Sequence, residues 1–203
     1  MKPAVVKKDR NYWVWVTHPD YYLEEDGEPR ASLEPGPKLE GWWTCHKNTR
    51  AGDLVLLYRT APKSDIAYLL RAEDNASSLV GDPGVGDHNW GYGCAYRSLY
   101  RFGTPLTYRA MKDDPYLDDW PALRDRFQRS AFAIPPPISR HLSSVLSHHC
   151  PEYSKALAKA DQTPVRILTE RRIEDRLSRD LGLLKPFGYK LALYESPDRR
   201  SGR

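Results

Sequence analysis

The tryptophans of this chain are the residues best suited to binding a flat ligand. All six of them lie at or before Trp120. From residue 1 to residue 164 the basic and acidic residues balance, while residues 165–203 carry ten Lys and Arg against six Asp and Glu. A body that is rich in aromatic rings and neutral in charge is poorly suited to hold duplex DNA through its phosphates alone. The pattern instead favours a pocket that grips something flat, although aromatic cores give a similar composition.

Other kinds of reactive site find little support in the sequence. The pairs Cys45-His46 and His149-Cys150 have no second pair of ligands at a spacing that suits zinc. The glycine-rich stretch 81–86 lacks the strand and the helix that a phosphate-binding loop requires. No Ser/His/Asp or Cys/His set for nucleophilic catalysis presents itself. We therefore expect no metal, no cofactor and no catalytic residue in this chain, and we interpret the chain alone as non-catalytic.

Length and composition suit one solid domain with an additional element, or two very small domains. The chain has 203 residues, of which 29% are charged. No apolar run of about 18 residues exists, so no membrane span is expected, and the lysines at the N-terminus precede no apolar core of a secretory signal. Three widely spaced cysteines do not suggest a disulfide framework, which favours a cytoplasmic location.

Strands are predicted for the first half of the chain and helices for the part that follows. Runs of β-branched and aromatic residues predict strands at 12–17, 54–59, 66–72 and 94–102, with Tyr96, Ser98 and Tyr100 on one side of the last. The stretches 18–41 and 75–93 are predicted to be long loops. Helices are predicted to begin near Trp120 and to cover 138–149 and 152–159. The pattern indicates an α+β fold in which a small β-barrel removes its own strand edges.

The domain organisation predicted from these elements has three parts. Residues 1–150 form the main domain, and residues 151–164 form a linker helix. Residues 165–203 contain one helix and one strand, which cannot bury a sizeable core by themselves. We interpret them as the truncated start of a second domain.

Five segments of the chain, in their order, resemble EVE domains. These segments are YWVWVTHPDYY, GWWTCHKNTRAGDLVLLYR, IAYLLRAE, YRFGTPLTY and FQRSAFAIP, and the resemblance covers residues 10–150. The most specific part is the block from Trp43 to Tyr58. EVE domains belong to the PUA-like superfamily and are related to the YTH readers of methylated RNA. The resemblance implies a PUA-like mixed β-barrel with flanking helices.

The resemblance also implies a pocket that encloses one modified base flipped out of a nucleic acid, most often a modified cytosine in DNA. Trp43 corresponds to the tryptophan of the pocket wall, and Thr44 follows it with a backbone that would contact the edge of the base. Trp90 and Tyr96 correspond to further aromatic residues of the pocket. Polar groups must identify the base itself, and the nearest candidates are His46, Asn48 and Asp53. The segment TCHKN departs from the common EVE pattern, so the preferred base is not determined by the resemblance.

The last 35 or so residues resemble a different family. TERRIEDRLSRDLGLLKPFGYKLALY is similar to the opening helix and strand of NucS-like nucleases of the PD-(D/E)XK class. That resemblance implies a reader that targets an endonuclease, in cis or in trans, in modification-dependent restriction. It carries no catalytic motif of that class.

Several arginines are expected to hold the phosphates that flank the base without reading sequence. Three alternatives to a DNA reader stay open from the sequence, namely an RNA or tRNA reader of the YTH type, a nuclease active by itself, and an interaction module without a ligand. Trp13, Trp15 and Trp120 are expected to pack in the core, and Trp42 is expected at a surface or edge. The arginines predicted to contact phosphates are Arg97, Arg101, Arg124, Arg126 and Arg129.

Overall fold

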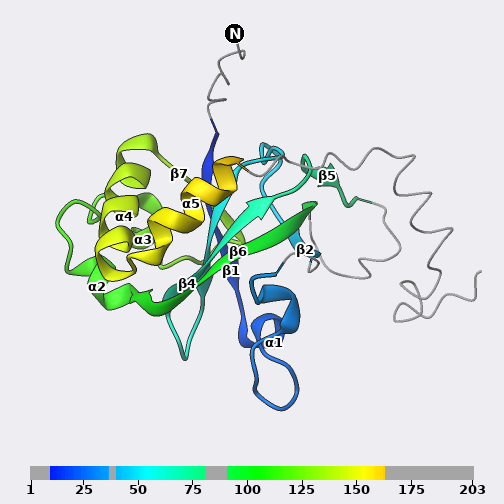
Figure 1. Ribbon diagram of the computed structural model, residues 1–203, viewed down its shortest axis with the longest axis horizontal. Coiled ribbons are helices and arrows are strands. Elements are labelled where there is room, and N and C mark those ends of the chain that lie inside the picture. The colour runs from blue at the N-terminus through cyan, green and yellow to red at the C-terminus, as the bar shows by residue number, and fades with distance from the viewer. Residues whose placement is uncertain (1–9, 37–39, 81–90, 163–203) are drawn as a thin grey trace, which may run out of the picture. The chain divides into compact units, whose positions relative to one another are not determined.

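The structure is a computed structural model that describes residues 10–36, 40–80 and 91–162. One mixed sheet forms its centre, with the strand order β2-β6-β4-β3-β1-β7 and with β5 paired to β6 (Figure 1). The strands are β1 (Tyr12–Thr17), β2 (Glu40–Thr44), β3 (Leu54–Arg59), β4 (Asp65–Ala72), β5 (Ser77–Ser78), β6 (Tyr92–Thr107) and β7 (Ala131–Ile134). The helices are α1 (Pro19–Tyr22), α2 (Tyr108–Lys112), α3 (Pro121–Arg124), α4 (Pro136–His149) and α5 (Glu152–Gln162), with a 3₁₀ turn at Ala31–Leu33.

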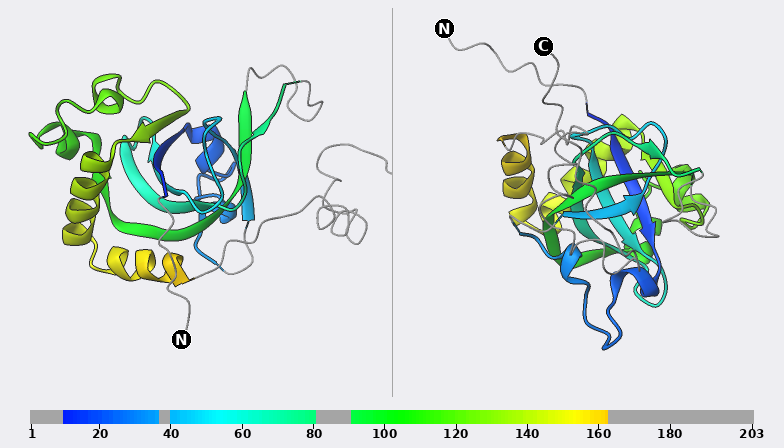
Figure 2. Two further views of the ribbon diagram at one scale, coloured as in Figure 1. Left: turned by 90° about the horizontal axis from the view of Figure 1, so that it is seen from above. Right: turned by 90° about the vertical axis from the view of Figure 1, so that its right-hand side faces the viewer.

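The sheet is antiparallel except between β1 and β3, which run parallel to each other. The sheet curls into a half-barrel, and helices flank it on the outside (Figure 2). The predicted strands at 12–17 and 54–59 have these bounds in the structure, and the predicted strand at 66–72 begins one residue earlier. The expected α+β fold with a mixed, curled sheet and flanking helices is therefore confirmed, whereas the expected closure is not, because β2 and β7 at the ends of the strand order do not pair with each other in the described part of the chain.

Alternation along the central strands divides the apolar residues between two cores. In β3, Leu54 and Leu56 face the core under the helices, whereas Val55 and Leu57 face the inside of the curl. All six residues of β3 are buried, because both faces of the sheet are covered. Trp13 and Trp15 pack in the inner core and Trp120 packs in the outer core, as expected from the sequence.

A β-bulge in β6 changes which residues share a face. The register between β4 and β6 shifts after Ser98, where Leu70 pairs with Ser98 and Leu69 pairs with Tyr100. One extra residue in the bulged strand exchanges the two faces beyond it. Tyr96 therefore lies in the inner core while Tyr100 packs against the outer one. The prediction that Tyr96, Ser98 and Tyr100 share one side was wrong for Tyr100.

The helices follow the sheet and close the outer core. α4 covers the predicted helix at 138–149 and begins two residues earlier, with prolines in its first turn, where missing N–H groups cost little. α5 covers the predicted helix at 152–159, and its Tyr153 and Ala160 are buried in the outer core. The segment predicted as a linker helix, 151–164, thus contains a helix packed on the barrel. The predicted helix near Trp120 is the single turn α3, and β7 and α2 were not predicted.

Two further predictions concern residues 165–203 and the absence of a membrane span. Residues 165–203, predicted to begin a nuclease-like domain, lie outside the described residues. Among the described residues, no helix has the length and apolar character needed to cross a membrane.

Candidate functional site

Trp43 lies at the end of β2 and is partly exposed between two other aromatic rings. Its ring meets the ring of Tyr96 edge to face at 6.0 Å and 81°, and the ring of Tyr21 at 6.5 Å and 79°. Gly41, which pairs with Tyr96, makes room for this arrangement, because a Cβ at Gly41 would lie 2.3 Å from the Tyr96 ring. We call Tyr21, Trp43 and Tyr96 the aromatic corner. Two perpendicular neighbours fix the Trp43 ring in the way that a wall for a flat ligand requires.

Tyr96 forms the buried side of the aromatic corner and is 1% exposed. Its hydroxyl donates to the carbonyl oxygen of Ser32 at 3.4 Å and approaches the Ser32 Oγ at 3.3 Å. Burial raises the pKa of Tyr96 above its ordinary value, so the ring stays neutral near pH 7. Ser98 donates to the carbonyl of Leu33 at 2.6 Å. These bonds hold the 3₁₀ turn against β6 and support the corner from behind.

The turn that follows β2 places His46 on Trp13. The two rings stack with centroids 5.0 Å apart and an angle of 24°. Asn48 lies exposed in the same turn, and its backbone N–H donates to Nδ1 of His46 at 3.1 Å. The predicted base-reading residues His46 and Asn48 are therefore adjacent, and the amide of Asn48 is exposed to solvent.

Asp53 is buried at the start of β3 and holds this turn together. One carboxylate oxygen accepts from Nε1 of Trp13 at 2.8 Å and from the backbone N–H of Arg50 at 2.9 Å. The other accepts from the backbone N–H of Asn11 at 3.0 Å. With both oxygens bonded inside the protein, the geometry gives Asp53 a positioning role. Its predicted contact with a base stays a prediction.

The remaining predicted pocket residues are placed less completely. Thr44 is half-buried and pairs with Gly93 at the end of β2, next to the aromatic corner. Trp90 lies outside the described residues. Trp42 is 45% exposed, as expected, and covers Gly93 on the face of β2 opposite to Trp43.

Two buried thiols lie beside the corner. Cys94 pairs with Trp43 across the sheet, and Cys45 follows Thr44. A hydrogen bond to Cys45, together with burial, raises the pKa of the Cys94 thiol above its usual range. Among the described residues, no group of three or more His, Cys, Asp and Glu could hold a metal ion.

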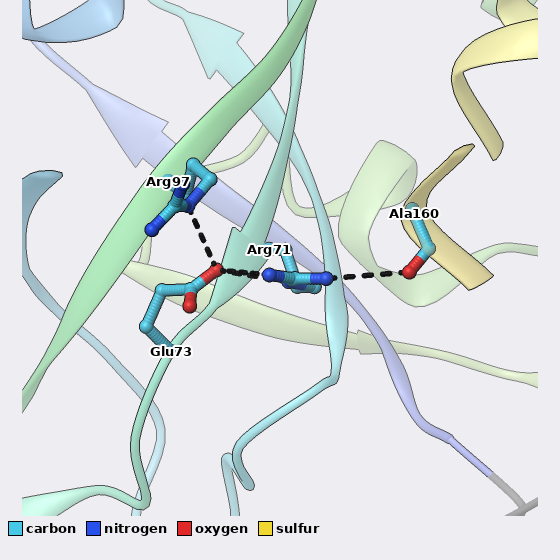
Figure 3. A network of polar contacts seen from close by, with 4 residues as sticks. All are labelled: Arg71, Glu73, Arg97 and Ala160. Atoms are coloured by element: carbon cyan, nitrogen blue, oxygen red, sulfur yellow. Dashed lines mark hydrogen bonds and ion pairs between the residues drawn. The ribbon is translucent and has the colours of Figure 1, made fainter. Parts of the chain in front are cut away.

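The predicted phosphate-binding arginines on β6 are engaged with carboxylates. Arg97 contacts Glu73 with its Nε 3.3 Å from the carboxylate oxygen, and Arg71 donates twice to the same oxygen at 2.9 and 2.7 Å (Figure 3). Arg71 also donates to the carbonyl of Ala160 at 3.2 Å, which ties α5 to the sheet. Arg101 is more exposed and pairs with Glu34 at 2.6 Å.

The other predicted phosphate contacts are exposed around α3. Arg129 pairs with Asp125 at 3.2 Å and lies over the ring of Phe132. Arg124 and Arg126 are exposed on the same stretch. Figure 1 shows α3 and β2 on opposite sides of the domain, so the structure does not bring these arginines to the aromatic corner.

Tyr21 is the member of the corner that the sequence did not indicate. It lies in α1, within a stretch predicted to be an irregular loop, and it meets Trp43 across more than twenty positions of the chain. The signal available was the aromatic pair Tyr21-Tyr22 shortly after the predicted strand at 12–17. Tyr22 is the buried one of the pair, which leaves Tyr21 for the site.

Comparisons with known proteins identify the fold. No family model matches the chain, and no curated protein sequence matches it significantly. Among solved structures, the DUF55 domain of human thymocyte nuclear protein 1 matches with a TM-score of 0.51 and 14% identity, covering 67% of this chain and 98% of that one. The fold is that of a DUF55 domain.

Two further structures agree with this result. Human THYN1 protein in complex with 5-methylcytosine-containing DNA matches with a TM-score of 0.50 and 15% identity, over 67% of this chain and 97% of that one. A protein from Agrobacterium tumefaciens matches with a TM-score of 0.51 and 14% identity, over 67% and 92%. The DUF55 fold agrees with the PUA-like barrel of EVE type expected from the sequence.

Proposed function

We propose that this protein binds a modified base, a modified cytosine in DNA, at the aromatic corner. The observation that carries the proposal is the placement of Trp43, which is partly exposed on the inner side of the barrel and fixed between Tyr21 and Tyr96. The proposal is supported by the complex of the human THYN1 protein, which shares the fold, with DNA that contains 5-methylcytosine.

The energetics of the corner suit this role. Extruding a base from a duplex costs a few kcal/mol, least when the base is mismatched or unpaired. Each aromatic face recovers about 1–3 kcal/mol per stacked base. One methyl group adds about 0.8 kcal/mol on burial, which corresponds to a preference of about 4-fold. Binding strength thus comes from the rings, while the polar groups of the His46–Asn48 turn are proposed to identify the base.

Fluorescence anisotropy tests the proposal. The probe is a labelled DNA strand with one central 5-methylcytosine, compared with the same strand carrying cytosine. We expect tighter binding of the methylated strand and loss of that preference in Trp43→Ala. Trp42→Ala is the matched control, since it removes the same ring from the same strand on the opposite face. An intact preference in a folded Trp43→Ala protein would place the base elsewhere.

The same assay separates DNA from RNA. The PUA-like fold is also used for RNA, so an unlabelled RNA strand with 5-methylcytosine competes against the bound DNA. We expect the DNA competitor to displace the probe at lower concentration. Stronger competition by RNA would reassign the protein as an RNA reader.

We also propose that exposed arginines hold the phosphates on either side of the base. Because α3 and β2 lie on opposite sides of the domain, a strand that contacts both must extend around the barrel. Arg124→Ala and Arg129→Ala are expected to weaken binding of methylated and unmethylated strands alike and to reduce the salt dependence. A salt slope equal to that of the wild type would remove these arginines from the footprint.

Targeting of a nuclease is the remaining part of the proposal. It is supported by the resemblance of the last 35 or so residues to NucS-like nucleases. Incubation of this chain with methylated DNA and Mg²⁺ or Mn²⁺ is expected to give binding without cleavage. Metal-dependent cleavage by this chain would show that it is an enzyme in itself.

A further inference from the structure

A cleft of about 520 Å³ opens at the edge of the sheet, and none of the residues that line it belongs to the aromatic corner. It lies where β1 begins, where β7 ends and where α4 starts, because Tyr12 pairs with Ile134 and β7 leads through Pro135 into α4. Its volume falls within the range of about 300–1,000 Å³ that is typical of small-ligand sites. The residues around it are Arg10, Asn11, Tyr12, Trp13, Ala133, Ile134, Pro135, Pro136, Ser139 and Arg140.

The walls of the cleft are mainly flat or apolar and are held rigidly. Tyr12 is half-buried, and Ile134 and Pro135 line the cleft beside it. Trp13 is only 3% exposed, so it serves as the floor. Asp53 and His46 fix the Trp13 ring from behind, through the 2.8 Å hydrogen bond and the stacked contact. A ring that enters the cleft would meet a floor that is already held in place, and such preorganisation favours binding.

Two guanidinium groups line the cleft, and one of them, that of Arg140, gives it a net positive charge. Arg10 pairs with Asp161 of α5, and its side chain is 24% exposed. Arg140 is exposed in α4 and makes no ion pair or side-chain hydrogen bond with any residue in the described part of the chain. An uncompensated guanidinium beside a flat apolar wall matches a ligand that joins an anion to a ring. Carboxylates are absent from the residues that line the cleft.

We propose that this cleft binds a nucleotide unit, with the base against Tyr12 and the prolines and the phosphate at Arg140. This site is separate from the aromatic corner and does not depend on the function proposed there. The unit can come from a free nucleotide or from a strand that already occupies the protein. Because Asp161 neutralises Arg10, Arg140 makes the main phosphate contact, and Asp161 limits the affinity.

Titration of the ¹⁵N-labelled protein with dTMP tests the proposal, with the indole N–H signal of Trp13 as the reporter. We expect dTMP to shift this signal and to saturate it, and thymidine and inorganic phosphate to bind more weakly. Arg140→Ala should weaken dTMP binding about 3- to 10-fold, as expected for a partly exposed charged hydrogen bond. Asp161→Asn should strengthen it, since it releases Arg10.

The control variant is Arg109→Ala, which removes an arginine charge at a different place. Arg109 lies on α2 with its side chain 93% exposed, so this variant should bind dTMP as the wild type does. The proposal is overturned if dTMP leaves the Trp13 signal unchanged, if Arg140→Ala binds as tightly as Arg109→Ala, or if inorganic phosphate binds as well as dTMP. Thermal unfolding confirms that each variant is folded.

A second titration shows whether the bound nucleotide is free or is part of a strand. It does not test the function proposed for the aromatic corner. A five-nucleotide thymidine strand carries no modified base. If this strand shifts the Trp13 signal and displaces dTMP, the cleft takes one unit of a strand. If dTMP binds equally with the strand present, the cleft takes free nucleotides. Either result supports the site.

Discussion

The buried carboxylate of Glu73 offers a sharp test of what holds this barrel together. Glu73 lies between Arg71 and Arg97: one of its oxygens accepts two hydrogen bonds from the guanidinium group of Arg71 and forms an ion pair with Arg97, whose Nε lies 3.3 Å away (Figure 3). The side chains of Glu73 and Arg71 are each only 2% exposed. The perturbation is Glu73→Ala, which removes the acceptor and leaves the charge of Arg71 buried.

The expected cost follows from the burial. Breaking a buried ion pair by removing one partner costs about 3–5 kcal/mol, because the other charge is left uncompensated. A domain of this size has about 5–15 kcal/mol of stability in total. Glu73→Ala should therefore remove about a fifth or more of the free energy of unfolding. Glu73→Gln, which keeps an acceptor but loses the charge, should cost less.

Urea unfolding monitored by tryptophan fluorescence measures the loss as a lower midpoint with an unchanged slope. Glu34→Ala is the matched control. Glu34 pairs with Arg101, which lies on β6 as Arg97 does, but the two side chains of this pair are 38% and 47% exposed. An exposed pair contributes about 0–1 kcal/mol. The double variant Arg71→Ala, Glu73→Ala should be less destabilised than the two single losses added together. Equal shifts for Glu73→Ala and Glu34→Ala would refute the reasoning.

Three further predictions concern other buried groups. Asp53→Ala should lower the free energy of unfolding by about 2–4 kcal/mol, since the Trp13 indole and two backbone donors lose their acceptor; a urea midpoint within error of the wild type would contradict this. Burial raises the pKa of Tyr153 to about 12, above the ordinary value near 10, so its contribution of about 2–3 kcal/mol is complete below pH 10 and is lost between pH 10 and 12. The urea midpoint should therefore fall less between pH 9 and pH 11 in Tyr153→Phe than in the wild type. Cys94 should react with a thiol reagent only after urea unfolding, because it is 1% exposed and its pKa is raised; rapid reaction of the native protein at this residue would show an opening that we do not expect.

Much of the fold could be predicted from local sequence because its strands and long helices carry strong patterns. Tyr12–Thr17 is aromatic or β-branched throughout, Leu54–Arg59 is apolar up to its last two residues, and α4 has clear helical spacing. The short elements could not be predicted in this way. β7 is the four-residue run AFAI before three prolines, and α2 is a five-residue helix capped by Thr107. The bulge after Ser98 depends on the partner strand, which the sequence of β6 alone does not reveal.

The sequence indicated aromatic residues for the candidate site but not their contacts. The rings of Trp43 and Tyr96 lie together, and their role in binding a base stays a prediction. The internal bonds of Asp53 join residues about forty positions apart, and no local pattern indicates them. The sequence predicted Arg97 as a cation free to contact a phosphate, but its side chain pairs with the buried carboxylate of Glu73. Long-range pairing of charges thus decides which arginines can reach a ligand.

The two glycines of the β2–β6 ladder link this architecture to the way the sequence can change. A Cβ at Gly41 would lie 2.3 Å from the ring of Tyr96, and one at Gly93 would lie 1.9 Å from the ring of Trp42. Each glycine is therefore tied to one large ring across the ladder. Any related protein with alanine at position 41 should carry a smaller side chain at position 96, and the same holds for positions 93 and 42. Substitutions at these sites should therefore occur in pairs. The aromatic residue should be replaced by a smaller one before the glycine is replaced.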